Sequence, residues 1–350
     1  MIRSARRRMW SVASFVVFFS VAGVFLGAAL AQSQTRPAAK AAAIPAPPPA
    51  FDDMPAPADN PVTADKIALG RQLFFDKRLS ADGTRSCYSC HVCEKGLTDG
   101  LPTAVGALGK KLTRSSPTLW NIGYHKEYYW DGRSASLEKQ GLAAWTGGNM
   151  GADPNLIVPA LNAIPGYKDQ FQKVFSTDVT ADGMMKAISS FERTLFCGTT
   201  RFDRSQQGDK KALTDAEKRG WEVFRGKGSC STCHAGILLT DMVYHNVGVG
   251  MDKAEPDPGR KKVTNADADL GAFKTPTLRD ISRSAPYFHD GSVATLEEAV
   301  DVMAGGGKPN PHLDMKNLQD RKLTAEEKKD LIAFLKSLDC ECSLSQPNLP

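Results

Sequence analysis

The hydrophobic pattern along the chain is that of short amphipathic helices joined by long loops. Four apolar residues near the C-terminus recur at a spacing that places them on one face of a helix: Leu331, Ile332, Leu335 and Leu338. Capping boxes at 214–217 (TDAE) and 324–327 (TAEE) mark the start of two helices, because their Thr and Glu side chains satisfy free backbone N–H groups of the first turn. The sequence has no long alternating strand pattern. It therefore predicts a mainly α protein whose long Gly- and Pro-rich loops can wrap a cofactor.

Two parts of the chain repeat each other. The segment from Pro117 (PTLWNIGYHKEYYWDGRSASLEK) aligns without a gap with the segment from Pro276 (PTLRDISRSAPYFHDGSVATLEE), at a constant offset of 159 residues. A motif of the form Gly-x-x-(Leu/Val)-Phe also occurs twice, at 70–74 and 220–224. We therefore expect two homologous helical domains, at 62–205 and 206–342, followed by a tail at 343–350.

The N-terminus has the pattern of an export signal. Four Arg residues precede a long apolar run that ends in small residues near Ala31, so residues 1–31 are predicted to be a cleaved signal peptide. An uncleaved membrane anchor is the alternative, because about 20 apolar residues can span a bilayer. In either case we expect a periplasmic protein. Residues 32–61 are rich in Ala and Pro, which predicts a semi-rigid linker.

The charge of the chain argues against a nucleic-acid partner. The formal net charge is +5, from 44 basic and 39 acidic residues. Residues 1–31 hold four of the Arg residues and no acid, so the remaining 40 basic and 39 acidic residues leave +1. A domain without a basic surplus lacks the electrostatic footprint of nucleic-acid binding.

Each repeat contains a Cys-x-x-Cys-His motif, CYSCH at 87–91 and CSTCH at 230–234. Two thiols at this spacing can bond to the two vinyl groups of one haem, and the adjacent histidine can then bind the iron. Zinc sites need four ligands at closer spacing than these two pairs provide. We therefore predict two c-type haems, attached and ligated by Cys87, Cys90 and His91 and by Cys230, Cys233 and His234.

Four cysteines remain outside these motifs: Cys93, Cys197, Cys340 and Cys342. In an oxidising compartment they can form up to two disulfides, in three pairings. Cys340 and Cys342 are too close in sequence for an easy bond with each other. The preferred hypothesis joins this C-terminal pair to Cys93 or Cys197, and the alternative is that some are buried free thiols.

The repeat predicts that the two haems differ. Met303 lies on an expected helix of the second repeat, and a thioether opposite histidine gives an electron-transfer haem of raised potential. A single Met is also a common core residue. The equivalent position in the first repeat, 159 residues earlier, is Ala144, which cannot bind iron. The first haem is therefore expected to be open and the second to have six ligands.

The chain resembles the bacterial di-haem cytochrome c peroxidases and their relative MauG. The resemblance runs from about residue 62 to residue 339 and is carried by motifs in the same order along the chain, among them LGRQLFFDKRLSADGTRSCYSCH, WDGRSASLEKQ, FERTLF, CSTCH and APYFHDGSVATLEEAV. It implies cytochrome-c-like domains, with a peroxidatic haem in the first and a high-potential haem, ligated by Met303, in the second. It also implies that Trp130 relays electrons between the haems and that Gln140 lies in the distal pocket.

Two departures from the family pattern affect the predicted activity. The histidine that caps the peroxidatic iron in resting peroxidases is replaced by Ala107, so the resemblance implies an iron that is open without prior reduction. The distal glutamate is replaced by Asn149, with Met150 as the alternative in the alignment. Asn cannot shuttle a proton at neutral pH, so weak peroxidase turnover is expected unless water or Asp153 substitutes. At the second haem, where MauG has tyrosine, Met303 follows the peroxidase pattern.

The resemblance also suggests a calcium ion between the domains, at Ser115, Ser284 and Pro286, with Ser115 in place of the family's asparagine. Main-chain carbonyls remain available as hard oxygen ligands there. His125 is an alternative cap for the open iron, against the plainer interpretation of a surface or loop histidine. His245 and His289 are expected beside the second haem.

Three functions follow from these features. The leading prediction is a periplasmic peroxidase that reduces hydrogen peroxide with electrons from a small cytochrome c or a cupredoxin. The second is a MauG-like enzyme that uses peroxide to oxidise residues of a protein substrate. The third is a di-haem electron-transfer or sensing protein without useful catalysis, which the missing glutamate favours. The sequence leaves a homodimer open.

Overall fold

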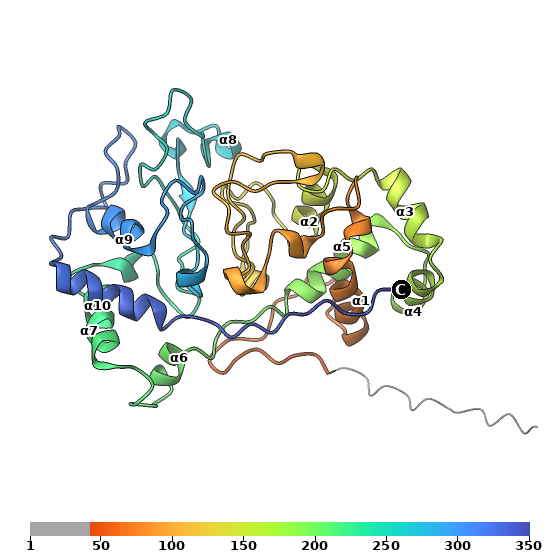
Figure 1. Ribbon diagram of the computed structural model, residues 1–350, viewed down its shortest axis with the longest axis horizontal. Coiled ribbons are helices and arrows are strands. Elements are labelled where there is room, and N and C mark those ends of the chain that lie inside the picture. The colour runs from red at the N-terminus through yellow and green to blue at the C-terminus, as the bar shows by residue number, and fades with distance from the viewer. Residues whose placement is uncertain (1–42) are drawn as a thin grey trace, which may run out of the picture. The chain divides into compact units, whose positions relative to one another are not determined.

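The computed structural model describes residues 43–350, all of which belong to one compact unit (Figure 1). The predicted signal peptide, 1–31, and the first part of the predicted linker lie outside the described residues. The structure is mainly helical, as predicted. No helix among the described residues has the length and apolar character needed to cross a bilayer.

Helices supply nearly all of the regular structure. The α-helices are α1 (Ala64–Phe75), α2 (Leu137–Thr146), α3 (Pro154–Asn162), α4 (Pro165–Phe175), α5 (Ala181–Glu192), α6 (Arg201–Gln206), α7 (Asp215–Arg225), α8 (Lys261–Thr264), α9 (Leu296–Ala304) and α10 (Ala325–Lys336). Two short strands, β1 (Tyr244–His245) and β2 (Phe273–Lys274), pair antiparallel with Tyr244 opposite Lys274. The capping boxes predicted before α7 and α10 are both formed.

The repeat in sequence is a repeat in structure. Helix α1 packs on α5 in one lobe, and α7 packs on α10 in the other. Each lobe has its own cluster of buried apolar residues, centred on Leu73 and Phe191 in the first and on Phe224 and Phe334 in the second. Leu331 and Leu335 of α10 are buried as the pattern predicts, whereas Leu338 is buried just beyond the end of the helix. The exact domain boundaries stay a prediction.

Backbone geometry repeats in the same register. Asn121 and Asp280, which are 159 residues apart, both have left-handed φ angles, of 56° and 61°. Tyr129 and Phe288, at the same offset, both have φ of 68°. Left-handed backbone is uncommon for residues other than glycine, so its recurrence at equivalent positions reflects one loop fold used twice.

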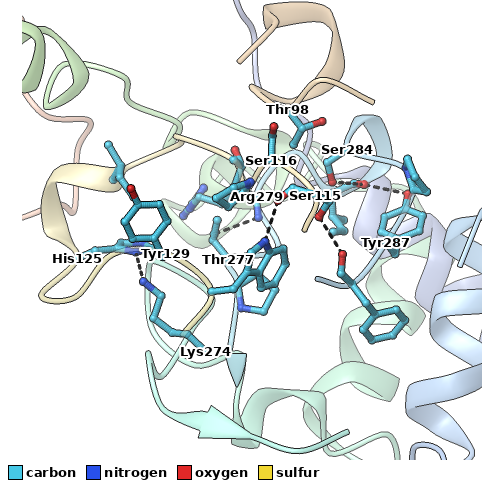
Figure 2. A pocket seen from close by; sticks show the side chains of 18 residues that line it. Thr98, Ser115, Ser116, His125, Tyr129, Lys274, Thr277, Arg279, Ser284 and Tyr287 are labelled. Atoms are coloured by element: carbon cyan, nitrogen blue, oxygen red, sulfur yellow. Dashed lines mark hydrogen bonds between the residues drawn. The ribbon is translucent and has the colours of Figure 1, made fainter. Parts of the chain in front are cut away.

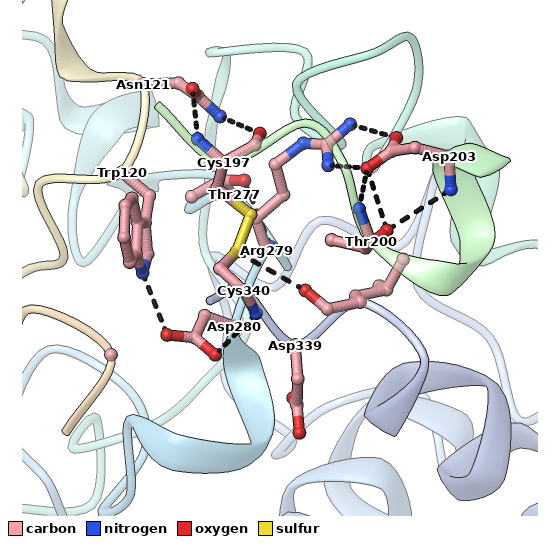
Figure 3. The surroundings of a disulfide bond; sticks show 12 residues. Trp120, Asn121, Cys197, Thr200, Asp203, Thr277, Arg279, Asp280, Asp339 and Cys340 are labelled. Atoms are coloured by element: carbon pink, nitrogen blue, oxygen red, sulfur yellow. Dashed lines mark hydrogen bonds and ion pairs between the residues drawn. A yellow bond between two sulfur atoms is a disulfide. The ribbon is translucent and has the colours of Figure 1, made fainter. Parts of the chain in front are cut away.

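The two lobes are joined at positions 143 residues apart, the offset that also relates the two Cys-x-x-Cys-His motifs. Cys197 follows α5 and Cys340 follows α10, and the two form a disulfide with a Cα–Cα distance of 5.6 Å (Figure 3). The backbone N–H of Cys197 donates to Asn121 and that of Cys340 donates to Asp280, at 3.0 Å each. The disulfide therefore lies between matching points of the two repeats.

A buried ion pair lies beside this disulfide. The Arg279 guanidinium donates two hydrogen bonds of 2.9 Å to the Asp203 carboxylate, and both residues are almost fully buried (Figure 3). Further hydrogen bonds from Arg279 to the Ile237 carbonyl, and from Thr200 to Asp203, satisfy the remaining polar atoms. Removing one partner of such a pair is strongly destabilising, because it leaves an unpaired buried charge.

The C-terminal tail crosses from the second lobe onto the first. A second disulfide joins Cys342 to Cys93, with a Cα–Cα distance of 5.7 Å. Arg71 then donates to the Ser345 carbonyl and Arg78 to that of Pro350, which places the chain end beside α1 and α4 (Figure 1). Both members of the C-terminal cysteine pair are thus tied to the first lobe, as the preferred hypothesis expects.

The described part of the linker lies against both lobes. It has no helix or strand before α1, as its composition predicts. Its Phe51 ring nevertheless packs 5.5 Å from the Tyr124 ring and 5.3 Å from the Arg279 guanidinium. Asn60 is fully buried and donates to Glu138. Residues 43–61 are therefore part of the folded body, and not a free tether.

The repeated glycine motif sets how closely the paired helices approach. A Cβ atom at Gly70 would overlap the Ala187 carbonyl of α5, and one at Gly220 would overlap the Asp330 carbonyl of α10. We expect Gly70→Ala to lower the free energy of unfolding by about 1–3 kcal/mol, the usual cost of overpacking. Calorimetry of the haem-loaded protein measures the change.

Gly141→Ala is the matched control for this prediction. Gly141 also lies within a helix, but an added Cβ meets only the sulfur of the flexible Met185 side chain, at 3.2 Å. We expect this variant to be neutral or more stable by up to about 1 kcal/mol, from the higher helix propensity of alanine. Equal destabilisation by the two substitutions would contradict the assigned role of Gly70.

Candidate functional site

The two Cys-x-x-Cys-His motifs have the same local structure. A short 3-10 turn begins at each first cysteine, and the N–H of each histidine returns to that cysteine's carbonyl, at 3.1 Å for His91 and 2.9 Å for His234. The four motif cysteines, unlike the other four, are outside the disulfides. Each motif therefore presents two thiols and one imidazole within a single turn.

Each motif histidine has one ring nitrogen held by the backbone. His91 Nδ1 lies 2.9 Å from the Leu97 carbonyl, and His234 Nδ1 lies 3.1 Å from the Leu239 carbonyl. Burial lowers the pKa of both histidines, which keeps the rings neutral. Nδ1 is then the donor and Nε2 has a free lone pair, the state in which histidine binds a metal. The residues thus fit a covalently attached haem in each lobe.

A cavity of about 830 Å³ adjoins the first motif, and Cys87, Cys90 and His91 line it. Pockets for small molecules and cofactors are typically about 300–1,000 Å³, so the volume suits a large prosthetic group. The three residues predicted to be catalytic also line this cavity: Trp130, Gln140 and Asn149. Their catalytic roles stay predictions.

Helix α2 and the turn after it supply the predicted distal residues. Ser136 caps α2, which carries Gln140 and Ala144 toward the cavity. Beyond the helix, the Asn149 carbonyl accepts a hydrogen bond of 2.9 Å from the N–H of Ala107. Gly106 lets these two segments meet, because a Cβ there would overlap the Gly148 carbonyl. The loop around Ala107 is therefore held against the turn that carries Asn149.

Several residues were candidates for the open position of the first iron. Ala144 lines the cavity and brings no ligand atom, as the repeat predicts. Met150, the alternative to Asn149 in the alignment, also lines the cavity and is buried, and it carries a thioether that can bind iron. His125 is not among the residues that line this cavity; it lines a second one, where its Nδ1 lies 3.3 Å from the Lys274 amine.

The second cavity, of about 110 Å³, lies between the repeats and is shown in Figure 2. Trp130 lines both cavities, and its indole N–H donates to the Ser115 carbonyl at 3.0 Å. The three residues predicted to bind calcium, Ser115, Ser284 and Pro286, also meet here. Within the described chain, the residues around this cavity include Lys274 and Arg279 and no carboxylate. Such a lining does not favour a divalent cation, and calcium stays a prediction.

His125 is more buried than a surface histidine. Burial, and then the charge of Lys274, lower the pKa of His125 to about 3, so its ring is neutral. Burial also lowers the pKa of Lys274 to about 8. His125 Nε2 is buried without a hydrogen-bond partner. His125 lies in a loop, as the plainer interpretation expects, but its ring is partly buried because Lys274 of the second lobe lies against it.

His245 and His289, both expected beside the second haem, lie in different surroundings. His245 lies between Asp314, 2.6 Å from its Nδ1, and Asp241, 3.2 Å from its Nε2. The nearby Cys233 sulfur and then these carboxylates raise the pKa of His245 to about 10. His289, expected beside the second haem, instead lines the first cavity and stacks on Phe273 with ring centres 3.7 Å apart.

Met303 lies near the end of α9, the helix predicted for it, and is half-buried. The Gly306 N–H donates to its carbonyl at 3.2 Å. A Thr295–Glu298 capping box fixes the start of this helix. The assignment of its sulfur as the sixth ligand of the second haem stays a prediction.

Sequence reasoning missed two charged residues at the first cavity. Arg114 lines it and binds Asp131 of the first lobe at 2.8 Å and Asp257 of the second at 2.7 Å, which ties the lobes together at the cavity. No motif in the sequence marks Arg114. Glu192, the last residue of α5, is buried and also lines the cavity. Glu192 could have been found, because the 143-residue offset of the two Cys-x-x-Cys-His motifs aligns it with an apolar residue, Leu335.

Comparisons with known proteins agree with this geometry. The family model described as di-haem cytochrome c peroxidase matches residues 64–211. The methylamine utilization protein MauG of Methylorubrum extorquens is 38% identical, over 85% of this chain and 85% of its own length. The cytochrome c551 peroxidase of Nitrosomonas europaea is 36% identical, over 81% of this chain and 83% of its own. A crystal structure of a MauG-like protein associated with microbial copper homeostasis aligns with a TM-score of 0.76 at 35% identity, over 85% of this chain and 94% of that one.

The assignment of the cysteines predicts haem stoichiometry. We expect a Cys87→Ala/Cys90→Ala variant to carry one covalently bound haem in place of two, because the other lobe keeps its own motif. The control is Cys93→Ser/Cys342→Ser, which removes two disulfide-bonded thiols near the same motif and should retain two haems. Mass spectrometry of the denatured proteins counts the haems. Loss of a haem from the control would contradict the assignment of Cys93 as a structural cysteine.

Proposed function

The chain belongs to the di-haem cytochrome c peroxidase family, and from that premise we propose that it is an exported peroxidase. In the proposed reaction one hydrogen peroxide is reduced to two water molecules by two electrons and two protons. A small reduced redox protein, a cytochrome c or a cupredoxin, supplies the electrons one at a time. When bound, the two c-type haems supply one iron that can take peroxide and one that can pass electrons.

The observation that supports this proposal most is a difference between the two repeats in the residue expected to bind the iron. Where the second repeat has Met303, the first has Ala144, whose methyl group lines the cavity and offers no ligand atom. The space beside it is bordered by Gln140, whose amide can donate a hydrogen bond to a small polar molecule. An iron position without a side-chain ligand and with a hydrogen-bond donor beside it suits the binding of peroxide better than simple electron transfer.

Proton handling at this cavity differs from that of an enzyme with a distal glutamate. Asn149 can donate and accept hydrogen bonds, but it does not exchange a proton at neutral pH. Loss of a positioned acid–base group typically lowers a rate by about 10²–10⁴-fold. We therefore propose that turnover is slow and that water in the cavity brings the protons.

Trp130 is the proposed route for electrons between the lobes. It borders both cavities, and its carbonyl accepts a hydrogen bond of 2.8 Å from the N–H of Lys274 in the second lobe. The hydrogen bond from its indole N–H to Ser115 fixes the ring. An aromatic ring fixed at the contact between the two lobes can serve as an intermediate site for electron transfer between their haems.

Export is part of the proposal. The N-terminal charge and apolar pattern supports it. The two disulfides of the folded body support it as well, because such bonds persist in oxidising compartments such as the periplasm.

A second candidate function is peroxide-dependent oxidation of a partner protein, as in MauG. Its support is the 38% identity to the Methylorubrum extorquens protein, together with Ala107 in the position where the peroxidases carry the capping histidine. In that case electrons leave the substrate protein through the second lobe, and no small donor protein is needed.

The test of the function is peroxide-driven oxidation of a reduced donor, followed by its absorbance. We expect two donor molecules to be oxidised for each peroxide, slowly in the wild type. Asn149→Glu should raise the rate at least about tenfold, because it restores a proton-transfer group. Asn149→Gln, which cannot exchange a proton, is the matched control and should leave the rate low.

Two other results would change the assignment. Failure to oxidise any donor, with peroxide-dependent modification of residues in a co-purified protein, would favour the second function. Failure of both reactions would contradict an enzymatic role and support a protein that only transfers electrons or senses a ligand.

A further inference from the structure

Glu192 is a buried carboxyl group for which the proposed reaction has no use. It is the last residue of α5 and only 7% exposed. It lines the cavity beside Cys87 and Cys90, and its Oε2 atom is buried without a hydrogen-bond partner. Burying a polar atom without a hydrogen-bond partner costs folding free energy. The reason for a carboxyl group at this position must therefore lie in the group that occupies the cavity.

The internal repeat shows that the fold does not require a carboxyl group here. Helices α5 and α10 are equivalent, and Phe191 aligns with Phe334 at the 143-residue offset that also relates the two Cys-x-x-Cys-His motifs. Glu192 then aligns with Leu335, which is 5% exposed in the core of the second lobe. The same helix position thus holds a buried apolar side chain in the second lobe and, in the first, a carboxyl group that lines the haem cavity.

The cation next to Glu192 is already paired. Arg193 is buried, and its Nη1 lies 2.7 Å from Oε1 of Glu138 on α2. The side chain of Asn60 donates to the same Glu138 oxygen at 2.9 Å. Arg193 therefore pairs with Glu138, and it makes no ion pair with Glu192. Burial raises the pKa of Glu192 to about 8, although Arg193 acts in the opposite direction.

The charge of Glu138 also raises the pKa of Glu192, and two uncharged side chains, Cys87 and Tyr128, lie near it. Burial raises the pKa of the Cys87 thiol and the charge of Glu192 raises it further, which places the carboxyl group near this cysteine. Burial also raises the pKa of Tyr128, to about 12, and Glu192 contributes in the same direction. With the haem attached, Cys87 is a thioether, so the haem edge bonded to it becomes the neighbour of Glu192.

We propose that Glu192 is held as a neutral carboxylic acid beside the first haem, and that the loss of its proton lowers the reduction potential of that haem alone. A negative charge in a poorly solvated cavity stabilises the more positive, oxidised iron and so disfavours reduction. Leu335 cannot have this effect on the second haem. The inference depends on the haem held by Cys87 and Cys90, and it is independent of the oxidant and of the electron donor.

The experiment is a spectroelectrochemical titration of both haems at pH values from well below 8 to well above 8. In the wild type we expect the potential of the first haem to fall as the pH rises through about 8, and that of the second haem to lack this step. Glu192→Gln keeps the size and polarity of the side chain but cannot ionise, and it should lose the step. Glu94→Gln removes an exposed carboxyl group beside the same motif and should keep it.

A step that persists in Glu192→Gln, or that is missing from the wild type, would overturn the proposal. If Glu192→Gln does not load haem, infrared spectroscopy of the wild type provides the second measurement. A protonated carboxyl band that is present at neutral pH and disappears above pH 8 supports the proposal, whereas the absence of such a band at neutral pH overturns it.

Discussion

The hydrogen bond between an imidazole Nδ1 and a backbone carbonyl is the interaction on which both haem sites depend. It occurs once in each repeat, from His91 to Leu97 and from His234 to Leu239. In each case it selects the tautomer with a free Nε2 and fixes the ring relative to the two thiols of the same turn. The two proximal histidines are therefore held in the same way, and a difference between the irons must come from the other residues around each haem.

The two lobes are linked to each other, and these links keep the surroundings of the two haem sites fixed. The Cys197–Cys340 disulfide joins equivalent points of the repeats, and the Cys93–Cys342 disulfide ties the tail to the turn beside the first motif. A cross-link across a loop of more than 100 residues removes roughly 4–5 kcal/mol of chain entropy from the unfolded state. The pairs of Arg114 with Asp131 and Asp257 add contacts between the lobes at the rim of the cavity itself.

Much of this arrangement could be predicted from the sequence, because the informative motifs occur once in each repeat and can be compared with each other. The Cys-x-x-Cys-His motifs, the capping boxes and the constant offset indicate two helical lobes, and Ala144 and Met303 are comparable only through that offset. The partial burial of His125 could not be predicted, because it comes from Lys274 and its neighbours, 149 residues away in the chain, and no local pattern reports such a contact. Arg114 was missed for the same reason. Glu192 was within reach of the sequence, since a carboxyl group aligned with Leu335 is an exception to the apolar pattern.

The central claim is that one haem iron is open and the other is closed by Met303. Electron paramagnetic resonance of the resting ferric protein, without prior reduction, tests it most directly. The account predicts equal amounts of one high-spin and one low-spin haem, with the high-spin signal lost in the Cys87→Ala/Cys90→Ala variant. Two low-spin signals would mean that a side chain such as Met150 closes the first iron, and two high-spin signals would mean that Met303 does not bind the second; either result would contradict the account.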